Sequence, residues 1–137
     1  MMDKRLKNWV INVLRRASFK WKARGEAEKK FRVPNGKFKT GRIKYGYKCN
    51  KCKQIFKKKD TVTDHTDPVI PMEGFSSFDD YIPRLFCEEY NFQVLCGPCH
   101  DVKTTKEKEF RARYRKIEEE DEGVLREEWK NFLDSFE

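Results

Sequence analysis

The sequence lacks any long apolar run. No stretch approaches the roughly 18–20 consecutive apolar residues that a membrane-spanning helix needs. Residues 1–20 hold six basic residues and no apolar segment of the kind found in secretory signals. We therefore expect no membrane partner and no export, and we expect the protein to stay in a reducing cytoplasm.

Apolar residues are also scarce overall. They make up 37% of the 137 residues, whereas 39% of the residues are charged. A small domain this polar buries little apolar surface and commonly needs a disulfide or a bound metal. In a reducing compartment, the five cysteines are expected to be metal ligands or free thiols rather than a disulfide framework.

Acidic residues are rare in the first sixty positions, which hold 21 Lys and Arg but only 4 Asp and Glu. That segment carries a net charge of +17, residues 61–137 carry −9, and the whole chain carries +8. Such an excess destabilises a compact state unless counter-charge binds, so we expect a nucleic-acid partner. The expected contacts are Arg15, Arg16, Lys20, Lys22, Arg24, Lys37, Lys39, Arg42 and Lys44. The aromatic residues Trp21, Phe38, Tyr45 and Tyr47 are expected to pack rather than to stack on bases.

Apolar residues recur at helical spacing in several segments. Residues 3–17 form an amphipathic pattern, which we expect to pack into the core. After a turn at Pro34-Asn35-Gly36, residues 38–47 interleave basic and apolar residues as in short strands or a basic hairpin. A helix that begins at Ser77 is expected to kink or split at Pro83.

The end of the chain predicts two more helices. The first runs from Asp101 to about Glu122, with Gly123 as its stop. The acidic run of residues 118–122 would then lie at a helix C-terminus, where the helix dipole disfavours negative charge. The last helix, over residues 125–136, is short and amphipathic, and it is expected to pack back on the domain.

The cysteines form two Cys-x-x-Cys pairs, Cys49/Cys52 and Cys96/Cys99, separated by 43 residues. Each pair supplies two thiolates from a tight knuckle, and four thiolates saturate a tetrahedral zinc ion. A closed zinc site also stabilises a fold that lacks apolar mass. The sequence therefore predicts a structural zinc site, and it leaves Cys87 as a small buried apolar residue.

Two other functions are compatible with parts of the Cys96-Gly97-Pro98-Cys99 segment. Thioredoxins use this tetrapeptide for disulfide exchange. That chemistry explains neither the upstream Cys pair nor the charge, and the alternation of strands and helices typical of thioredoxins is missing. The zinc-deaminase pattern fails as well, because no His-x-Glu occurs.

The chain has only two histidines, and neither has an ordinary setting. His65 directly follows Asp64 at the end of a strand-like segment. His100 directly follows Cys99, where a zinc knuckle would fix its position, and Asn91 lies nine residues before it.

This order of Asp64-His65, Asn91 and His100 resembles the HNH endonucleases, the His-Asn-His group of ββα-metal nucleases. The similarity covers about residues 45–107 and extends to the zinc-containing HNH proteins of bacteriophages. It rests on Tyr47-x-Cys-x-x-Cys52, Val62-Thr63-Asp64-His65, Pro68-Val69, Gly74-Phe75, Tyr81-Ile82, Asn91 to Cys96, and Cys99-His100-x-x-Lys103-Thr104. Thr66 replaces the usual apolar residue after the first His, and Pro83 interrupts the insert helix.

The resemblance implies an α+β fold with a small ββα-metal (HNH) core and a four-cysteine zinc site, flanked by N-terminal and C-terminal helices. It divides the chain into a basic leader at 1–44, a nuclease core at 45–107 and a helical extension at 108–137. The implied partner is DNA, and the implied setting is the cytoplasm of a bacterial host, in a phage protein of DNA processing or packaging.

The same resemblance assigns the catalytic roles. His65 is the general base, and Asn91 stabilises the loop that orients it. Asp64 and His100 hold a catalytic Mg²⁺ or Mn²⁺. Lys103 is expected either to contact a DNA phosphate or to be an ordinary surface lysine. Thr104 stands where some relatives have a third His ligand, so two protein ligands are expected. The alternative from another class is a zinc-knuckle DNA-binding module without catalysis.

Overall fold

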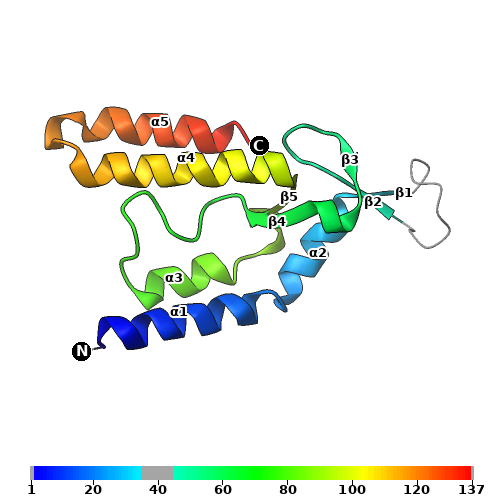
Figure 1. Cartoon of the computed structure of the whole chain (residues 1–137), viewed down its shortest axis with the longest axis horizontal. Coiled ribbons are helices and arrows are strands. Elements are labelled where there is room, and N and C mark those ends of the chain that lie inside the picture. Colours follow the sequence, from blue (N-terminus) through cyan, green and yellow to red (C-terminus); the bar gives the residue numbers. More distant parts are fainter. Residues whose placement is uncertain (1, 35–44, 137) are drawn as a thin grey trace.

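A computed structural model describes residues 2–34 and 45–136 of the chain, which form a mixed α+β structure (Figure 1). The α+β class predicted from the sequence is therefore confirmed. The elements in chain order are α1 (Lys4–Ser18), α2 (Lys22–Lys30), β1 (Arg32–Pro34), β2 (Tyr45–Lys48), β3 (Ile55–Phe56), β4 (Thr61–His65), α3 (Phe78–Leu85), β5 (Phe92–Cys96), α4 (Gly97–Lys116) and α5 (Glu122–Asp134). Most of the predicted basic hairpin, with Lys37, Phe38, Lys39, Arg42 and Lys44, lies outside the described residues.

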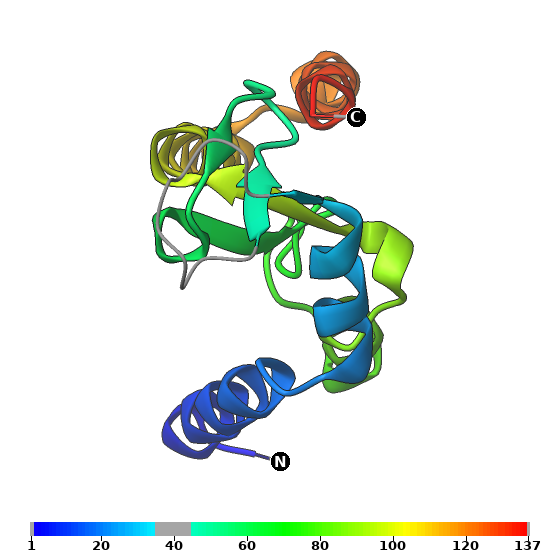
Figure 2. The same ribbon diagram turned by 90° about the vertical axis from the view of Figure 1, so that its right-hand side faces the viewer.

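Two small antiparallel sheets organise the molecule. One has the strand order β1-β2-β3, and the other consists of β4 and β5. All five residues of β5 are buried, and both α2 and α4 contact this strand. Figure 2 shows these two helices flanking the β4–β5 pair. Because β5 continues directly into α4, the last strand and the longest helix share a rigid junction at Cys96 and Gly97.

The C-terminal helices pack along one another and enclose an apolar cluster of Met72, Phe110 and Leu125 (Figure 1). The packing of the last helix on the domain is confirmed. The predicted limits of α4 are wrong, because this helix begins at Gly97 and ends at Lys116. Helix α4 also continues past residue 107, where the sequence reasoning ended the nuclease core, so no helix or strand ends there.

Gly123 does not stop a helix, contrary to the prediction, but lies in the first turn of α5. The acidic run of residues 118–122 therefore precedes and begins α5. A helix N-terminus stabilises negative charge through its dipole, so the run lies where carboxylates are favourable. This placement removes the conflict that the sequence pattern presented.

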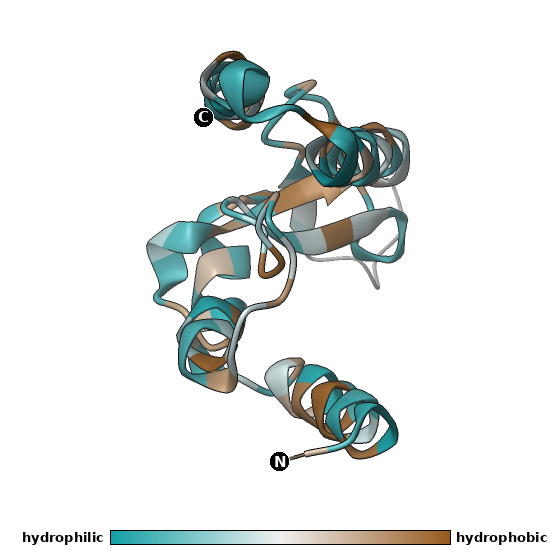
Figure 3. Ribbon diagram, turned by 90° about the vertical axis from the view of Figure 1, so that its left-hand side faces the viewer, coloured by the Kyte–Doolittle hydropathy of each residue, from teal (hydrophilic) through white to brown (hydrophobic). Residues whose placement is uncertain are grey.

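Helix α3 begins as predicted, since the backbone N–H of Asp80 donates to the Ser77 hydroxyl at 3.2 Å. Pro83 lies inside this helix without splitting it. Helix α1 packs against α3 but buries its apolar side incompletely, because Leu6 is 48% exposed and Trp9 is 60% exposed. Figure 3 shows brown, apolar segments on α1 at the edge of the molecule. The prediction that this stripe is core holds only in part.

Within residues 2–34 and 45–136, no helix combines the length and the apolar character needed to cross a bilayer.

Candidate functional site

The four paired cysteines come together, and they could hold a metal ion. Their sulfur atoms all lie within 4.8 Å of one another, and the Sγ atoms of Cys52 and Cys96 are 3.9 Å apart. Tetrahedral zinc with Zn–S bonds of about 2.3 Å places its sulfur ligands about 3.8 Å apart. The cluster therefore fits the size and donor chemistry of a structural zinc site.

Local backbone geometry forms the first of the two knuckles. The amide of Lys53 donates to the Cys49 carbonyl, and the amide of Cys49 donates to the Gln54 carbonyl, each at 2.9 Å. Lys53 adopts a left-handed conformation with φ 64°, which lets the chain reverse within four residues. The amide of Asn50 donates to the Val94 carbonyl at 2.8 Å, so this knuckle is attached to β5.

The electrostatics of the cluster favour a bound cation. Burial opposes ionisation of Cys49, but backbone N–H groups outweigh it and lower the pKa of this thiol to about 7. Burial, together with the neighbouring thiols, raises the pKa of Cys99 to about 12. Four thiolates in so small a space repel one another, so all four become charged only when a cation neutralises them.

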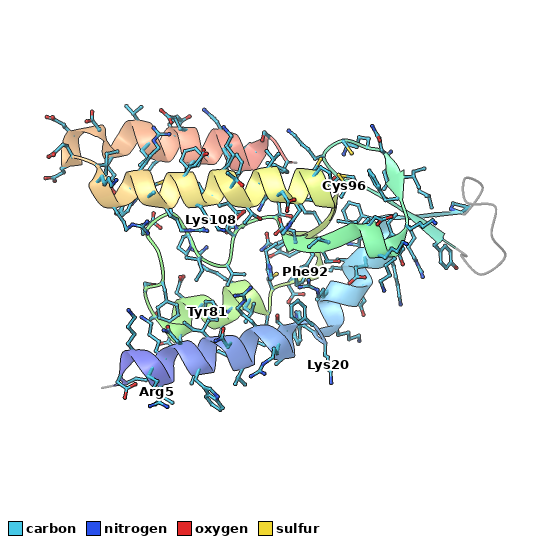
Figure 4. All side chains as sticks on the ribbon, viewed as in Figure 1. Arg5, Lys20, Tyr81, Phe92, Cys96 and Lys108 are labelled. Carbon is cyan, nitrogen blue, oxygen red and sulfur yellow. The ribbon has the colours of Figure 1, made fainter. Side chains whose placement is uncertain are left out.

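The second group of candidate residues lies toward the other end of the same strand pair. Asp64 is paired with Gln93, and His65 is paired with Phe92. In Figure 4 the labels of Phe92 and Cys96 mark the two ends of β5. His100, in the first turns of α4, brings its Nε2 to 3.9 Å from Oδ1 of Asp64. The structure thus brings Asp64 and His100 together, and the cysteines are the only larger group of possible ligands among the described residues.

His65 has one ring nitrogen engaged. Its Nε2 lies 2.9 Å from the carbonyl oxygen of Leu85. A carbonyl only accepts hydrogen bonds, so Nε2 carries the proton of the neutral ring and Nδ1 keeps a lone pair. Burial lowers the pKa of His65, although the bond to Leu85 partly opposes this effect. The ring is therefore neutral at neutral pH and presents Nδ1 as a proton acceptor.

Asn91 is attached to the segment that follows His65. Its carbonyl accepts from the amide of Thr66 at 2.8 Å, and its Oδ1 accepts from the amide of Asp67 at 3.1 Å. These two bonds fix the chain at the end of β4, where it leaves the sheet. Asn91 therefore acts on the position of His65 through the backbone.

Lys103 does not lie where the sequence reasoning placed it. Its side chain is fully buried, with 0% exposure for the residue. The ammonium contacts Asp64 Oδ2 at 2.9 Å, Glu107 Oε1 at 2.6 Å and the carbonyl of His65 at 3.1 Å. The expected contact with a DNA phosphate is wrong for this structure, because protein acceptors already surround the ammonium.

Two residues near Asp64 were not found from the sequence. Gln93 is buried, and its Nε2 donates to Asp64 Oδ2 at 3.4 Å. Glu107 lies one helical turn after Lys103, and that spacing was a signal for a Lys–Glu pair. Nothing local in the sequence pointed to Gln93, whose role depends on strand register.

The other expected DNA contacts within residues 2–34 fall into two groups, and Lys37, Lys39, Arg42 and Lys44 lie outside the described residues. Arg15, Arg16, Lys20 and Lys22 are exposed. Arg24 differs, because its Nη2 donates to the Thr63 carbonyl at 2.7 Å and burial lowers its pKa. Its guanidinium joins α2 to β4, so part of its hydrogen-bonding capacity is already used within the protein.

Trp21, Tyr47 and the fifth cysteine pack against the protein, whereas Tyr45 packs only in part. Trp21 donates from Nε1 to the Cys87 carbonyl at 2.7 Å and meets the Phe86 ring edge-on. Tyr47 is buried, whereas Tyr45 is 43% exposed with the Arg32 guanidinium over its ring. Cys87 is half-buried against an apolar cluster of α2 and β5 and has a pKa raised by burial.

Comparison of the chain with protein-family models, with curated proteins and with solved structures gave no match.

Proposed function

We propose that this protein is a metal-dependent endonuclease of the HNH type, which hydrolyses DNA phosphodiester bonds and leaves a 5′ phosphate and a 3′ hydroxyl. One observation carries the proposal. A neutral His65 with an accepting Nδ1 directly follows Asp64, which forms an oxygen–nitrogen pair with His100. Asp64 and His65 lie on β4, and His100 lies on α4, which follows the partner strand β5; this is the order of the resemblance noted in the sequence.

The oxygen–nitrogen pair suits a catalytic divalent ion. Metal–ligand bonds of about 2.1 Å place neighbouring ligands about 3.0 Å apart and opposite ligands about 4.2 Å apart. The 3.9 Å between Asp64 Oδ1 and His100 Nε2 lies between these two spacings, so the two side chains would close slightly to occupy neighbouring positions of one ion. Mg²⁺ or Mn²⁺ held there would act as a Lewis acid toward the phosphate and its departing oxygen.

The chain's own residues supply the remaining functions. His65 takes a proton from the attacking water at Nδ1, while its Nε2–H stays bonded to the Leu85 carbonyl and keeps the ring oriented. Asn91 holds the backbone behind the base. The four cysteines, with a structural zinc ion, fix the junction between β5 and α4 and thereby the position of His100.

The test is cleavage of supercoiled plasmid by the purified protein with Mg²⁺, with Mn²⁺ or with EDTA. We expect nicked or linear product with either metal and none with EDTA. His65→Ala should lower the rate about 10²–10⁴-fold, because it removes the proton acceptor. Zinc content and DNA affinity should stay at the wild-type level, because His65 contacts neither the cysteines nor the exposed cations.

Two companion variants separate the roles. His100→Ala and Asp64→Ala should weaken binding of the divalent ion, and more Mn²⁺ should partly restore cleavage. A mock purification from cells without the gene excludes a contaminating nuclease. Cleavage by His65→Ala at the wild-type rate would make this mechanism wrong.

In that case the better account is a zinc-knuckle DNA-binding module without catalysis. The cysteine cluster and the exposed Arg15, Arg16, Lys20 and Lys22 would suffice for such a function. A redox role is disfavoured, because Cys96 and Cys99 share one cluster with Cys49 and Cys52.

A further inference from the structure

Lys103 is the largest side chain that the described structure buries completely. A buried ammonium is costly unless partners of opposite charge surround it. The carboxylates of Asp64 and Glu107 both contact it, and their side chains are only 18% and 12% exposed. The three groups form a buried ionic triad with one carboxylate charge left over, and it lies where the divalent ion is proposed to bind.

The triad makes the two oxygens of Asp64 unequal. Oδ2 accepts from Lys103 at 2.9 Å and from Gln93 at 3.4 Å. Oδ1 faces His100 at 3.9 Å, which is beyond hydrogen-bonding distance. One oxygen is thus occupied by a protein cation, while the other points toward a nitrogen ligand.

We propose that Lys103 is a built-in cation that occupies Oδ2 of Asp64 and so confines a divalent ion to Oδ1, on the His100 side. This inference rests on the proposed function, from which it takes the Asp64–His100 ion site. Lys103 is then a positioning residue that acts through Asp64.

Glu107 explains why a protein cation is needed beside Asp64. Asp64 and Glu107 contact the same ammonium nitrogen, so a cation in its place would contact both carboxylates. Mg²⁺ and Mn²⁺ prefer carboxylate oxygens, and two carboxylates attract them more strongly than one. Without Lys103, a divalent ion would therefore settle between Asp64 and Glu107 and away from His100.

The experiment measures Mn²⁺ binding to the zinc-loaded full chain without DNA, by electron paramagnetic resonance. Pulsed measurements also report whether a histidine nitrogen is bound to Mn²⁺. The wild-type protein should show the nitrogen signal, and His100→Ala should lose it with about tenfold weaker binding. Lys103→Met should bind Mn²⁺ at least as tightly as wild type but without the nitrogen signal. In the Lys103→Met background, His100→Ala should change the affinity by less than about twofold.

Lys106→Met is the matched control, because it removes the same charge from an exposed position of α4. It should leave both affinity and nitrogen signal unchanged. Glu107→Gln keeps the proposal testable if Lys103→Met fails to fold. Because Lys103 excludes the ion from Glu107, this variant should keep the nitrogen signal.

Several results would overturn the proposal. One is that Lys103→Met keeps the nitrogen signal and that its Mn²⁺ affinity still falls about tenfold with His100→Ala. This outcome leaves the proposed function intact. A fall in Mn²⁺ affinity in Glu107→Gln as large as that in His100→Ala would likewise show that the ion touches Glu107 in the wild-type protein. The absence of any Mn²⁺ binding to wild type would instead overturn both the inference and the proposed function.

Discussion

The two ends of the β4–β5 strand pair carry two groups of side chains with opposite character, one that could hold a metal ion and one that we propose to hold one. At the Cys96 end, four sulfur donors face one another, and they are enough to saturate a tetrahedral ion. At the other end, Asp64 and His100 offer one oxygen and one nitrogen, and a protein ammonium already holds the second oxygen. A saturated site stabilises structure, whereas a site with open positions leaves room for water and a phosphate. The number of ligand atoms therefore distinguishes a structural site from the proposed catalytic site more clearly than burial does.

The largest expected effect comes from breaking the saturated site. Cys96→Ser should abolish the cooperative thermal transition, because structural zinc contributes about 10–16 kcal/mol of apparent binding free energy in small zinc domains. Calorimetry measures the loss of the transition, and metal analysis measures the loss of zinc. Cys87→Ser is the control, since Cys87 lies outside the cluster. It should retain about one zinc per chain. A zinc-free protein that folds and forms a reversible Cys96–Cys99 disulfide would contradict the prediction.

Phe136 lies between the two ends and tests the packing that joins them. The residue is 4% exposed, it packs against Cys49, Leu95 and Cys96, and its ring centroid lies 5.8 Å from the Lys103 ammonium. Phe136→Ala should lower the free energy of unfolding by about 3–5 kcal/mol, as measured by urea denaturation. Tyr90→Ala, at a position 81% exposed, should change it by less than about 0.5 kcal/mol. Equal effects of the two substitutions would contradict the packing described here.

Asn91→Ala should affect the Asp64–His100 end of the strand pair and leave the cysteine cluster unchanged. It removes the acceptor that holds the Asp67 amide, so the backbone behind His65 loosens. We expect cleavage to fall about 10–100-fold, the cost typical of removing a supporting group around a metal or catalytic residue. Zinc content should not change. Asn131→Ala, at an exposed position of α5, is the control. Unaltered cleavage by Asn91→Ala would remove Asn91 from the proposed mechanism.

The smallest expected effect concerns DNA affinity. Replacing Arg15 and Arg16 by Gln should weaken DNA binding. The slope of log affinity against log salt concentration should become shallower by about 0.9 for each phosphate that the variant no longer neutralises. Deleting residues 1–40 is a poorer test, because α2 contributes Ala23 and Ala27 to the core. Lys130→Gln, exposed on α5, is the control. Fluorescence anisotropy at several salt concentrations measures the slopes, and equal slopes for all three proteins would contradict a DNA-facing role for α1.

Sequence spacing predicted the features that depend on short range. The cysteine pairs, the Ser77 helix start and the last amphipathic helix follow local rules, and the structure has all three. Gly123 misled the prediction because glycine is tolerated both after a helix and in its first turn. The same ambiguity placed the acidic run at the wrong helix end.

The burial of Lys103 could not be predicted, because it depends on a partner from another element. A lysine on a helix is usually exposed, and only the approach of β4 brings Asp64 to it. Arg24 is a similar case, since its acceptor Thr63 lies 39 positions away. The exposure of Leu6 and Trp9 was also not predicted. An amphipathic pattern identifies the apolar side of α1 but not how much of that side α3 covers.

Strand β5 continues into α4 without a loop. The side chains that α4 contributes to the cysteine cluster and to the Asp64–His100 group therefore have fixed directions relative to one another. Cys99, His100, Lys103 and Glu107 follow one another around this helix at about 100° per residue. Inserting one residue between Cys99 and Lys103 would rotate Lys103 away from Asp64 while the cysteines stayed in place. This stretch should therefore accept substitutions at the exposed Asp101 and Val102 but no change in length.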